Sequence, residues 1–265
     1  MRFARTFVLA LLSLLLTLPA LPQTLATAAV QRDPQALSVL NQVLNMAGGS
    51  QALGTIQDLT ATGNITYNWG DNDVRGSATV RSRGTDQFRL DATLPNGVRT
   101  IVVSNETAAI RETSGETREI PFFNAINLGS LTYPYAILGS VLKNQTATVQ
   151  YLGSVTKNGH NAHQVRIQPI PATAEPSGML HKLSTKDFFI DATTYKILST
   201  LDMVHPDGDF NQEYPREISF SDYRIVNGVL VSFECEERVN GQHTWNIQLT
   251  NLSFNTGISD NDFQL

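Results

Sequence analysis

Few side chains have the type and spacing needed for catalysis, and the clearest pair is a serine three residues before a lysine. Ser140 and Lys143 match the Ser-x-x-Lys spacing of penicillin-recognising enzymes, in which one helical turn places a lysine beside the nucleophile. No Lys-Thr-Gly element follows, and neither a Gly-x-Ser-x-Gly elbow nor a phosphate-binding glycine loop occurs. A hydrolase is therefore a minor alternative. We expect no enzyme and no cofactor.

Metal-binding patterns are equally weak. His160 and His163 are three residues apart, but no acidic residue or cysteine lies near them in the sequence to complete a site. The run 207–213 places oxygen ligands at alternate positions, yet Gln212 stands where an EF-hand needs glycine. We expect no metal site; a turn between strands is favoured at 207–213, with weak calcium binding as a minor alternative. Cys235 is the only cysteine, so no intrachain disulfide forms.

The first 28 residues have the organisation of a secretory signal peptide. Arg2 and Arg5 precede an almost wholly apolar run from Thr6 to Pro22, and Ala26-Thr27-Ala28 has the small residues that signal peptidase recognises. We expect cleavage near Ala28. The mature protein is then periplasmic or secreted, and we expect residues 29–265 to form a single lipid-binding domain.

The charge balance excludes one class of partner. The 265 residues have a formal net charge of −5, and only 16% of them are charged. Nucleic-acid binding calls for a basic patch or stripe, so we expect no nucleic-acid partner.

The elements that would position any site are mainly strands. Asp33-Pro34 is typical of a helix start, and Gly48-Gly49 ends the apolar stripe that follows, with one further turn capped by Ser50. From Leu59 to Pro121, strands rich in Thr, Val and Ile are separated by turn residues, among which we count Gly76. Alternating apolar residues give this sheet one apolar face, which includes Phe88, Leu90, Ile101, Val103 and Ile110.

An apolar segment, Phe122 to Lys143, interrupts the strands. Pro134 prevents one regular helix, so the pattern predicts two short helical pieces or a helix and a loop. Two interpretations stay open: a fixed plug of the sheet's core, or a movable lid over a cavity. In either case, apolar residues of this segment face the sheet: Phe123, Ile126, Leu131 and Leu138.

Strands resume at Thr146 and continue to the C-terminus. Asn158-Gly159, Asn227-Gly228 and Asn240-Gly241 each predict a tight hairpin. The fold class is mainly β with a few helices (α+β), arranged as a half-open antiparallel β-barrel wrapped around short helices. Such a barrel is filled by its own helices or leaves space for a ligand.

Residues near the C-terminus resemble a known family. The run 221–233, Ser-Asp-Tyr-Arg-Ile-Val-Asn-Gly-Val-Leu-Val-Ser-Phe, and the run 252–263 are similar to the end of bacterial outer-membrane lipoprotein-sorting (LolA/LolB-like) proteins. Residues 189–197 resemble the preceding strand and turn, and 79–83 with 88–90 resemble an early strand pair. Gly84 and Ser232 replace family prolines, which indicates a distant member.

The resemblance implies a hydrophobic cavity for acyl chains beneath helices that form a lid. It also implies that Arg83, at the end of an early strand, holds this lid closed. We therefore expect a non-enzymatic carrier or binding protein, with transport or chaperone activity toward a lipid or a lipoprotein acyl chain. The cavity would be lined by the nine apolar residues of the sheet and the segment named above.

An alternative on the same fold is an envelope-stress sensor or protein-interaction module. Under either hypothesis, a membrane-associated protein is a candidate partner. Bound lipid distinguishes the first hypothesis, and a stable protein complex distinguishes the second.

Overall fold

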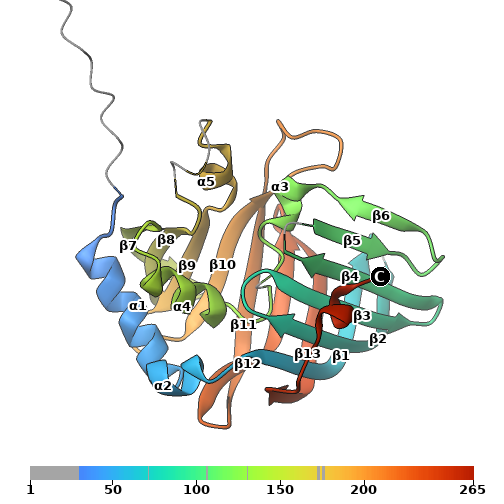
Figure 1. Cartoon of the computed structure of the whole chain (residues 1–265), viewed down its shortest axis with the longest axis horizontal. Helices are drawn as coiled ribbons and strands as arrows, with labels where there is room; N and C mark the ends of the chain where they lie inside the picture. The colour runs from blue at the N-terminus through green and yellow to red at the C-terminus, as the bar shows by residue number, and fades with distance from the viewer. Residues whose placement is uncertain (1–29, 71, 106, 130, 172–173, 175–176) are drawn as a thin grey trace, which may run out of the picture.

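In the part of the chain that the structure describes, 13 strands form one antiparallel sheet that curves around short helices (Figure 1). The computed structural model describes residues 30–265 except 71, 106, 130, 172–173 and 175–176, so the expected signal peptide lies outside the described residues. The strands are β1 (Asp58–Trp69), β2 (Asn72–Arg83), β3 (Gln87–Leu94), β4 (Gly97–Ser104), β5 (Thr107–Arg111), β6 (Thr117–Ile120), β7 (Thr148–Lys157), β8 (His160–Gln168), β9 (Lys186–Asp191), β10 (Ile197–Val204), β11 (Tyr214–Val226), β12 (Val229–Val239) and β13 (Gln242–Phe254).

The strand order makes the barrel half-open. Two meanders, β1 to β6 and β7 to β13, join through the antiparallel pairing of β1 with β13. The free edges are β6 and β7, which follow one another in the sequence. Residues 121–147, named here the linking segment, therefore connect the two edges of the sheet. This confirms the predicted fold class.

Short helices occupy the open side of the sheet (Figure 1). The linking segment contains two of them, as its proline predicts. The helices are α1 (Pro34–Met46), α2 (Gly49–Gly54), α3 (Phe122–Ala125), α4 (Tyr135–Lys143) and α5 (Met179–Leu183), with a 3₁₀ turn η1 (Asp260–Phe263).

Helix α1 begins where the sequence predicts and covers an edge of the sheet. Asp33 Oδ1 accepts hydrogen bonds from the backbone N–H groups of Gln35 and Ala36, at 2.7 and 3.1 Å, and satisfies two free donors of the first turn. The backbone just before the helix pairs with β7, through Val149 N to Gln31 O at 2.8 Å and Asp33 N to Val149 O at 2.9 Å. The edge strand β7 is thereby partly covered.

One continuous hydrophobic core fills the concave side of the sheet. Phe88 and Leu90 of β3 lie in it with Leu40 of α1 and Leu138 of α4, all at most 3% exposed. Cys235 of β12 is also buried in the core. Burial of apolar surface on this scale is the main stabilising term of such a domain.

The three predicted hairpins form with the expected turn chemistry. In each, the asparagine and the glycine both have positive φ: 50° and 79° at Asn158-Gly159, 49° and 81° at Asn227-Gly228, and 51° and 79° at Asn240-Gly241. These are type I′ turns, whose twist matches that of the flanking strands.

Three local expectations were wrong or incomplete. Gly76 is no turn: it lies inside β2, where a Cβ would be 2.0 Å from the carbonyl oxygen of Thr93 on the neighbouring strand. Helix α2 is capped by Gly48 and not by Ser50. Helix α5 was not predicted. Within the described residues, no helix is long and apolar enough to cross a membrane.

Candidate functional site

The linking segment is docked at its N-terminal end by asparagine side chains. Asn124 mimics a backbone pair with His205: its Nδ2 donates to the His205 carbonyl oxygen at 2.8 Å, and its Oδ1 accepts from the His205 N–H at 2.9 Å. Asn127 is 6% exposed, and its Nδ2 donates to the carbonyl oxygen of Leu183 at 2.7 Å. These bonds fix α3 and the residues after it against the end of α5 and the residue that follows β10.

A buried ion cluster lies beneath Asn127. Lys186 Nζ is 2.7 Å from Asp202 Oδ2, and Arg216 Nε and Nη2 donate to the two oxygens of the same carboxylate at 2.8 and 2.9 Å. The three side chains are 3–4% exposed. Burial acts to raise the pKa of Asp202, but the charges of Arg216 and Lys186 outweigh it and lower the pKa. Both cations also donate to the carbonyl oxygen of Asn127, at 3.5 and 3.4 Å.

The C-terminal end of the linking segment is held by Arg32. Its Nη1 lies 2.8 Å from the carbonyl oxygen of Asn144, 3.1 Å from that of Ala147 and 3.3 Å from that of Val141. Carbonyl groups at a helix C-terminus lack intrahelical partners and attract cations. Arg32 therefore fixes the end of α4 against the residues that precede α1.

The middle of the linking segment touches the β2–β3 turn, residues 84–86. A Cβ on Gly129 would lie 2.1 Å from the carbonyl oxygen of Thr85 and 2.8 Å from the Cα atom of Asp86. Only glycine permits so close a backbone approach. The segment is thus seated on the turn as well as anchored at both ends.

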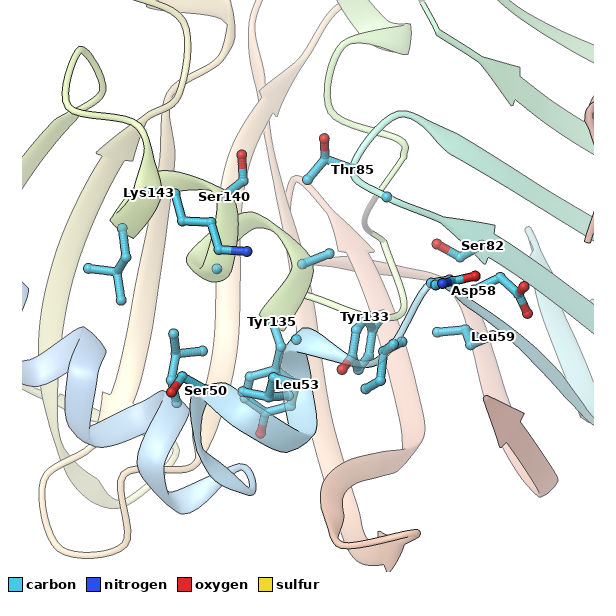
Figure 2. Close-up of a pocket in the computed structure, with 18 of the residues that line it drawn as sticks. Ser50, Leu53, Asp58, Leu59, Ser82, Thr85, Tyr133, Tyr135, Ser140 and Lys143 are labelled. Atoms are coloured by element: carbon cyan, nitrogen blue, oxygen red, sulfur yellow. The ribbon is translucent and has the colours of Figure 1, made fainter. Parts of the chain in front are cut away.

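Two cavities of ligand size lie beside α4. The larger, here the tyrosine cavity, has a volume of about 670 Å³ and lies between α1, α2, α4 and the ends of β1 and β2 (Figure 2). Apolar groups of Leu44, Leu53, Ile56, Leu59, Tyr133 and Tyr135 line it, together with polar groups of Asn41, Ser50, Gln57 and Ser82 and the charged side chains of Asp58, Asp86 and Lys143.

The second cavity, here the apolar cavity, has a volume of about 430 Å³. Both volumes fall in the usual range of ligand pockets, about 300–1,000 Å³. The wall of the apolar cavity is built mainly from apolar side chains of β4, of α3 and its C-cap, of α4, of α5 and of the chain between β8 and α5: Val103, Phe122, Ala125, Ile126, Ile137, Val141, Pro169, Ile170 and Leu180.

The phenol groups of Tyr133 and Tyr135 form a polar but uncharged part of the wall of the tyrosine cavity. The rings of Tyr133 and Tyr135 pack edge to face with centroids 5.7 Å apart, and Tyr133 also packs on Phe254 at 6.0 Å. Burial raises the pKa of both phenols well above the usual range, so both stay protonated at neutral pH.

The structure places the nine predicted lining residues in two groups. Val103 and Ile126 line the apolar cavity. The others pack in or against the interior, and Phe123 packs against His205 and Phe210 with centroids 5.4 Å away in both cases. Their contact with a ligand stays a prediction. The buried or half-buried members of this second group are Phe88, Leu90, Ile101, Ile110, Leu131 and Leu138.

Arg83 contacts the C-terminal segment. Its Nη1 donates to the carbonyl oxygen of Ile258 at 3.1 Å, its Nη2 forms an ion pair with Asp260, and its guanidinium lies 5.5 Å from the ring centroid of Phe263. These contacts fasten residues 258–263 to β2. The expected role of Arg83 in holding residues 122–144 stays a prediction.

The other side chains considered for chemistry have structural surroundings. Ser140 and Lys143 lie on α4 at the cavity walls. The penicillin-recognising enzymes also have a Ser-Asp-Asn element, and this triplet is found at 259–261, but Ser259 caps η1 and Asp260 pairs with Arg83. His160 lies 3.0 Å from Asp191, and His163 2.9 Å from the Tyr151 hydroxyl. Among the residues that the structure describes, no group of three metal-binding side chains converges.

Sequence reasoning missed the anchors of the linking segment. The sequence gives no indication that Arg32 is an anchor, because its hydrogen-bond partners are more than 100 positions away. Asn124 and Asn127 could have been recognised, because a polar residue inside an apolar run is expected to have a buried hydrogen-bond partner.

Comparisons with known proteins identify the fold. No family model matches the chain, and no curated protein matches its sequence. A LolA superfamily protein from Nitrosomonas europaea has a TM-score of 0.54 at 8% identity, over 87% of this chain and 97% of that chain. A DUF1329 family protein from Desulfovibrio piger has a TM-score of 0.52 at 14% identity, over 88% and 98%.

A protein domain named for outer membrane lipoprotein sorting, from Vibrio parahaemolyticus, has a TM-score of 0.51 at 11% identity, over 87% and 96% of the two chains. At such low identities these likenesses establish a shared architecture. This chain therefore shares its half-open barrel fold with a LolA superfamily protein and with a lipoprotein-sorting domain, which is the fold that the sequence resemblance predicted.

Proposed function

We propose that this chain is a non-enzymatic periplasmic carrier or binding protein for a lipid or for the acyl chain of a lipoprotein. The observation that carries the proposal is the pair of ligand-sized cavities beside α4, inside a barrel similar to that of a lipoprotein-sorting domain. The expected signal peptide supports a location in the envelope.

The apolar cavity supplies the driving force for binding. Val103, Ile126 and Ile137 present hydrocarbon to it, and each methylene moved from water into such a site contributes about 0.8 kcal/mol. The cavity exists before the ligand arrives, so little ordering of the protein opposes binding. Phe88 and Leu90 pack in the hydrophobic core behind the wall of the apolar cavity. Leu138 packs α4 against the same core.

Native mass spectrometry of the protein purified from its own envelope tests the proposal. We expect a bound lipid mass, and after delipidation we expect uptake of a fluorescent fatty acid. A chain that is always empty and takes up no fatty acid contradicts the carrier function, and a stable complex with another protein in its place supports the interaction-module alternative.

A filled-cavity variant sharpens the test. Ile126→Trp places an indole at the half-buried wall of the apolar cavity and is expected to exclude fatty acid from that cavity, so that the total uptake per chain falls. Leu152→Trp is the matched control, because Leu152 is 42% exposed on β7 and lines neither cavity. Equal uptake by the two variants contradicts binding in the apolar cavity.

A further inference from the structure

Helix α4 presents a different face to each cavity. Ile137 and Val141, four residues apart, line the apolar cavity, whereas Ala136, Gly139 and Lys143 line the tyrosine cavity. Residues three or four apart share one face of a helix, so these two sets lie on neighbouring faces. Helix α4 is therefore a wall between two compartments.

Both compartments reach the same exposed gap. Ser140 of α4 and Thr85 and Asp86 of the β2–β3 turn are exposed, and each lines both cavities. In Figure 2, Ser140 and Thr85 lie on either side of this gap. A molecule seated at the gap has access to the space on both sides of α4.

Helix α4, which separates the two cavities, is fixed in place by its anchors. Arg32 binds the carbonyl groups at the end of α4, Asn127 is bonded to Leu183 and to the buried cations, and Gly129 is seated on the β2–β3 turn. Moving α4 aside to merge the cavities would break charge-assisted and buried hydrogen bonds together, which is costly. The two compartments are thus separate binding spaces in the folded protein.

Of the two compartments, the tyrosine cavity has the more polar wall. The Lys143 side chain points into the tyrosine cavity (Figure 2), and among the described residues it has no ion-pair or hydrogen-bond partner. Ser50 and Ser82 add hydroxyl groups to the same cavity. An anionic group near Lys143 would gain an ion pair there at an exposed position. The apolar groups of Leu44, Leu53 and Ile56 suit the rest of the tyrosine cavity to a hydrocarbon chain, as the apolar wall suits the other cavity.

We propose that the ligand is a two-chain amphiphile that straddles α4. One acyl chain occupies each cavity, the linkage between the chains crosses the gap at Ser140, Thr85 and Asp86, and an anionic headgroup lies near Lys143. This inference rests on the proposed function and narrows its substrate class from any acyl chain to a lipid with two chains.

Stoichiometry tests the inference without any variant. Native mass spectrometry of the delipidated chain is carried out with phosphatidylglycerol, lysophosphatidylglycerol and palmitate in separate experiments. We expect one phosphatidylglycerol per chain but two palmitates, one for each cavity. One palmitate per chain with no phosphatidylglycerol bound overturns the inference and leaves the proposed function standing. Absence of every lipid overturns both.

Two filled-cavity variants test the division of the chains. Ala136→Trp fills the tyrosine cavity and Ile126→Trp fills the apolar cavity. Each is expected to lower phosphatidylglycerol affinity at least tenfold and to reduce palmitate from two to one, while Leu152→Trp changes neither. Lys143→Gln is expected to weaken phosphatidylglycerol binding several-fold and leave palmitate stoichiometry at two. If only one of the two filled variants affects phosphatidylglycerol, a single cavity holds the ligand and the inference is wrong.

Discussion

Replacing Gly129 with alanine is expected to unseat the linking segment from the β2–β3 turn. The added Cβ would lie 2.1 Å from the Thr85 carbonyl oxygen and 2.8 Å from the Asp86 Cα, distances that force backbone to move. Overpacking of this kind costs about 1–3 kcal/mol. For a chain of this size, each kilocalorie per mole of lost stability lowers Tm by about 2–4 °C. We therefore expect a clearly lower Tm in thermal unfolding and a lower midpoint in urea unfolding.

Gly139 provides a matched control in the same segment. Among the described residues, apart from its chain neighbours and the backbone of its own helix, no atom lies within 4 Å of a Cβ placed on Gly139. This residue is inside α4, where alanine is better than glycine by about 0.5–1 kcal/mol. The two glycine-to-alanine changes are therefore expected to have opposite signs. Urea denaturation followed by the fluorescence of Trp69 and Trp245 measures both, and hydrogen exchange at residues 84–86 reports the local opening. Unchanged stability and exchange in Gly129→Ala would refute the close seating of the segment.

Three further predictions concern charged anchors. Arg32→Ala removes a charged donor from the end of α4 and is expected to cost about 1.5–3 kcal/mol, with faster hydrogen exchange at 141–147; unchanged exchange there would exclude the anchor. Asp202→Asn leaves Lys186 and Arg216 buried without their carboxylate and is expected to cost about 3–5 kcal/mol in urea denaturation, and a neutral result would show that the cluster is not buried. Burial acts to raise the pKa of Asp58, but hydrogen bonds from 256–258 lower it below 3.8, so its stabilisation is complete above pH 3.8 and is lost as the pH falls through the lower pKa of the folded state. Asp58→Asn is expected to flatten this part of the pH profile of the urea midpoint, and an unchanged slope would contradict the assignment.

Local chemistry made much of the fold predictable. The cap at Asp33, the asparagine-glycine hairpins and the alternation in β3 each depend on residues close together in the sequence. Pro134 gave the break before α4 for the same reason. Gly76 was wrongly assigned to a turn, because glycine is required there by a close contact with the backbone of another strand and not by a turn.

Long-range contacts made the site unpredictable in detail. Apolar residues of the linking segment are expected to face the sheet, but their sequence does not say which of them fill the core and which border space. All three of Ile137, Leu138 and Val141 lie in the core, but only Ile137 and Val141 also border the apolar cavity, although the three lie within five consecutive residues of α4. The separation of two cavities by α4 depends on Arg32 and on the ion cluster below Asn127, whose members are distant in sequence.

Crystallography can show on which side of α4 each acyl chain of a bound lipid lies. A crystal structure of the protein soaked with phosphatidylglycerol brominated on both acyl chains would locate each chain by the anomalous scattering of bromine. We predict bromine peaks on both sides of α4, one set in the tyrosine cavity and one in the apolar cavity. Bromine in only one of the two cavities, or phosphatidylglycerol bound only on the outer surface, would show that the lipid does not straddle α4.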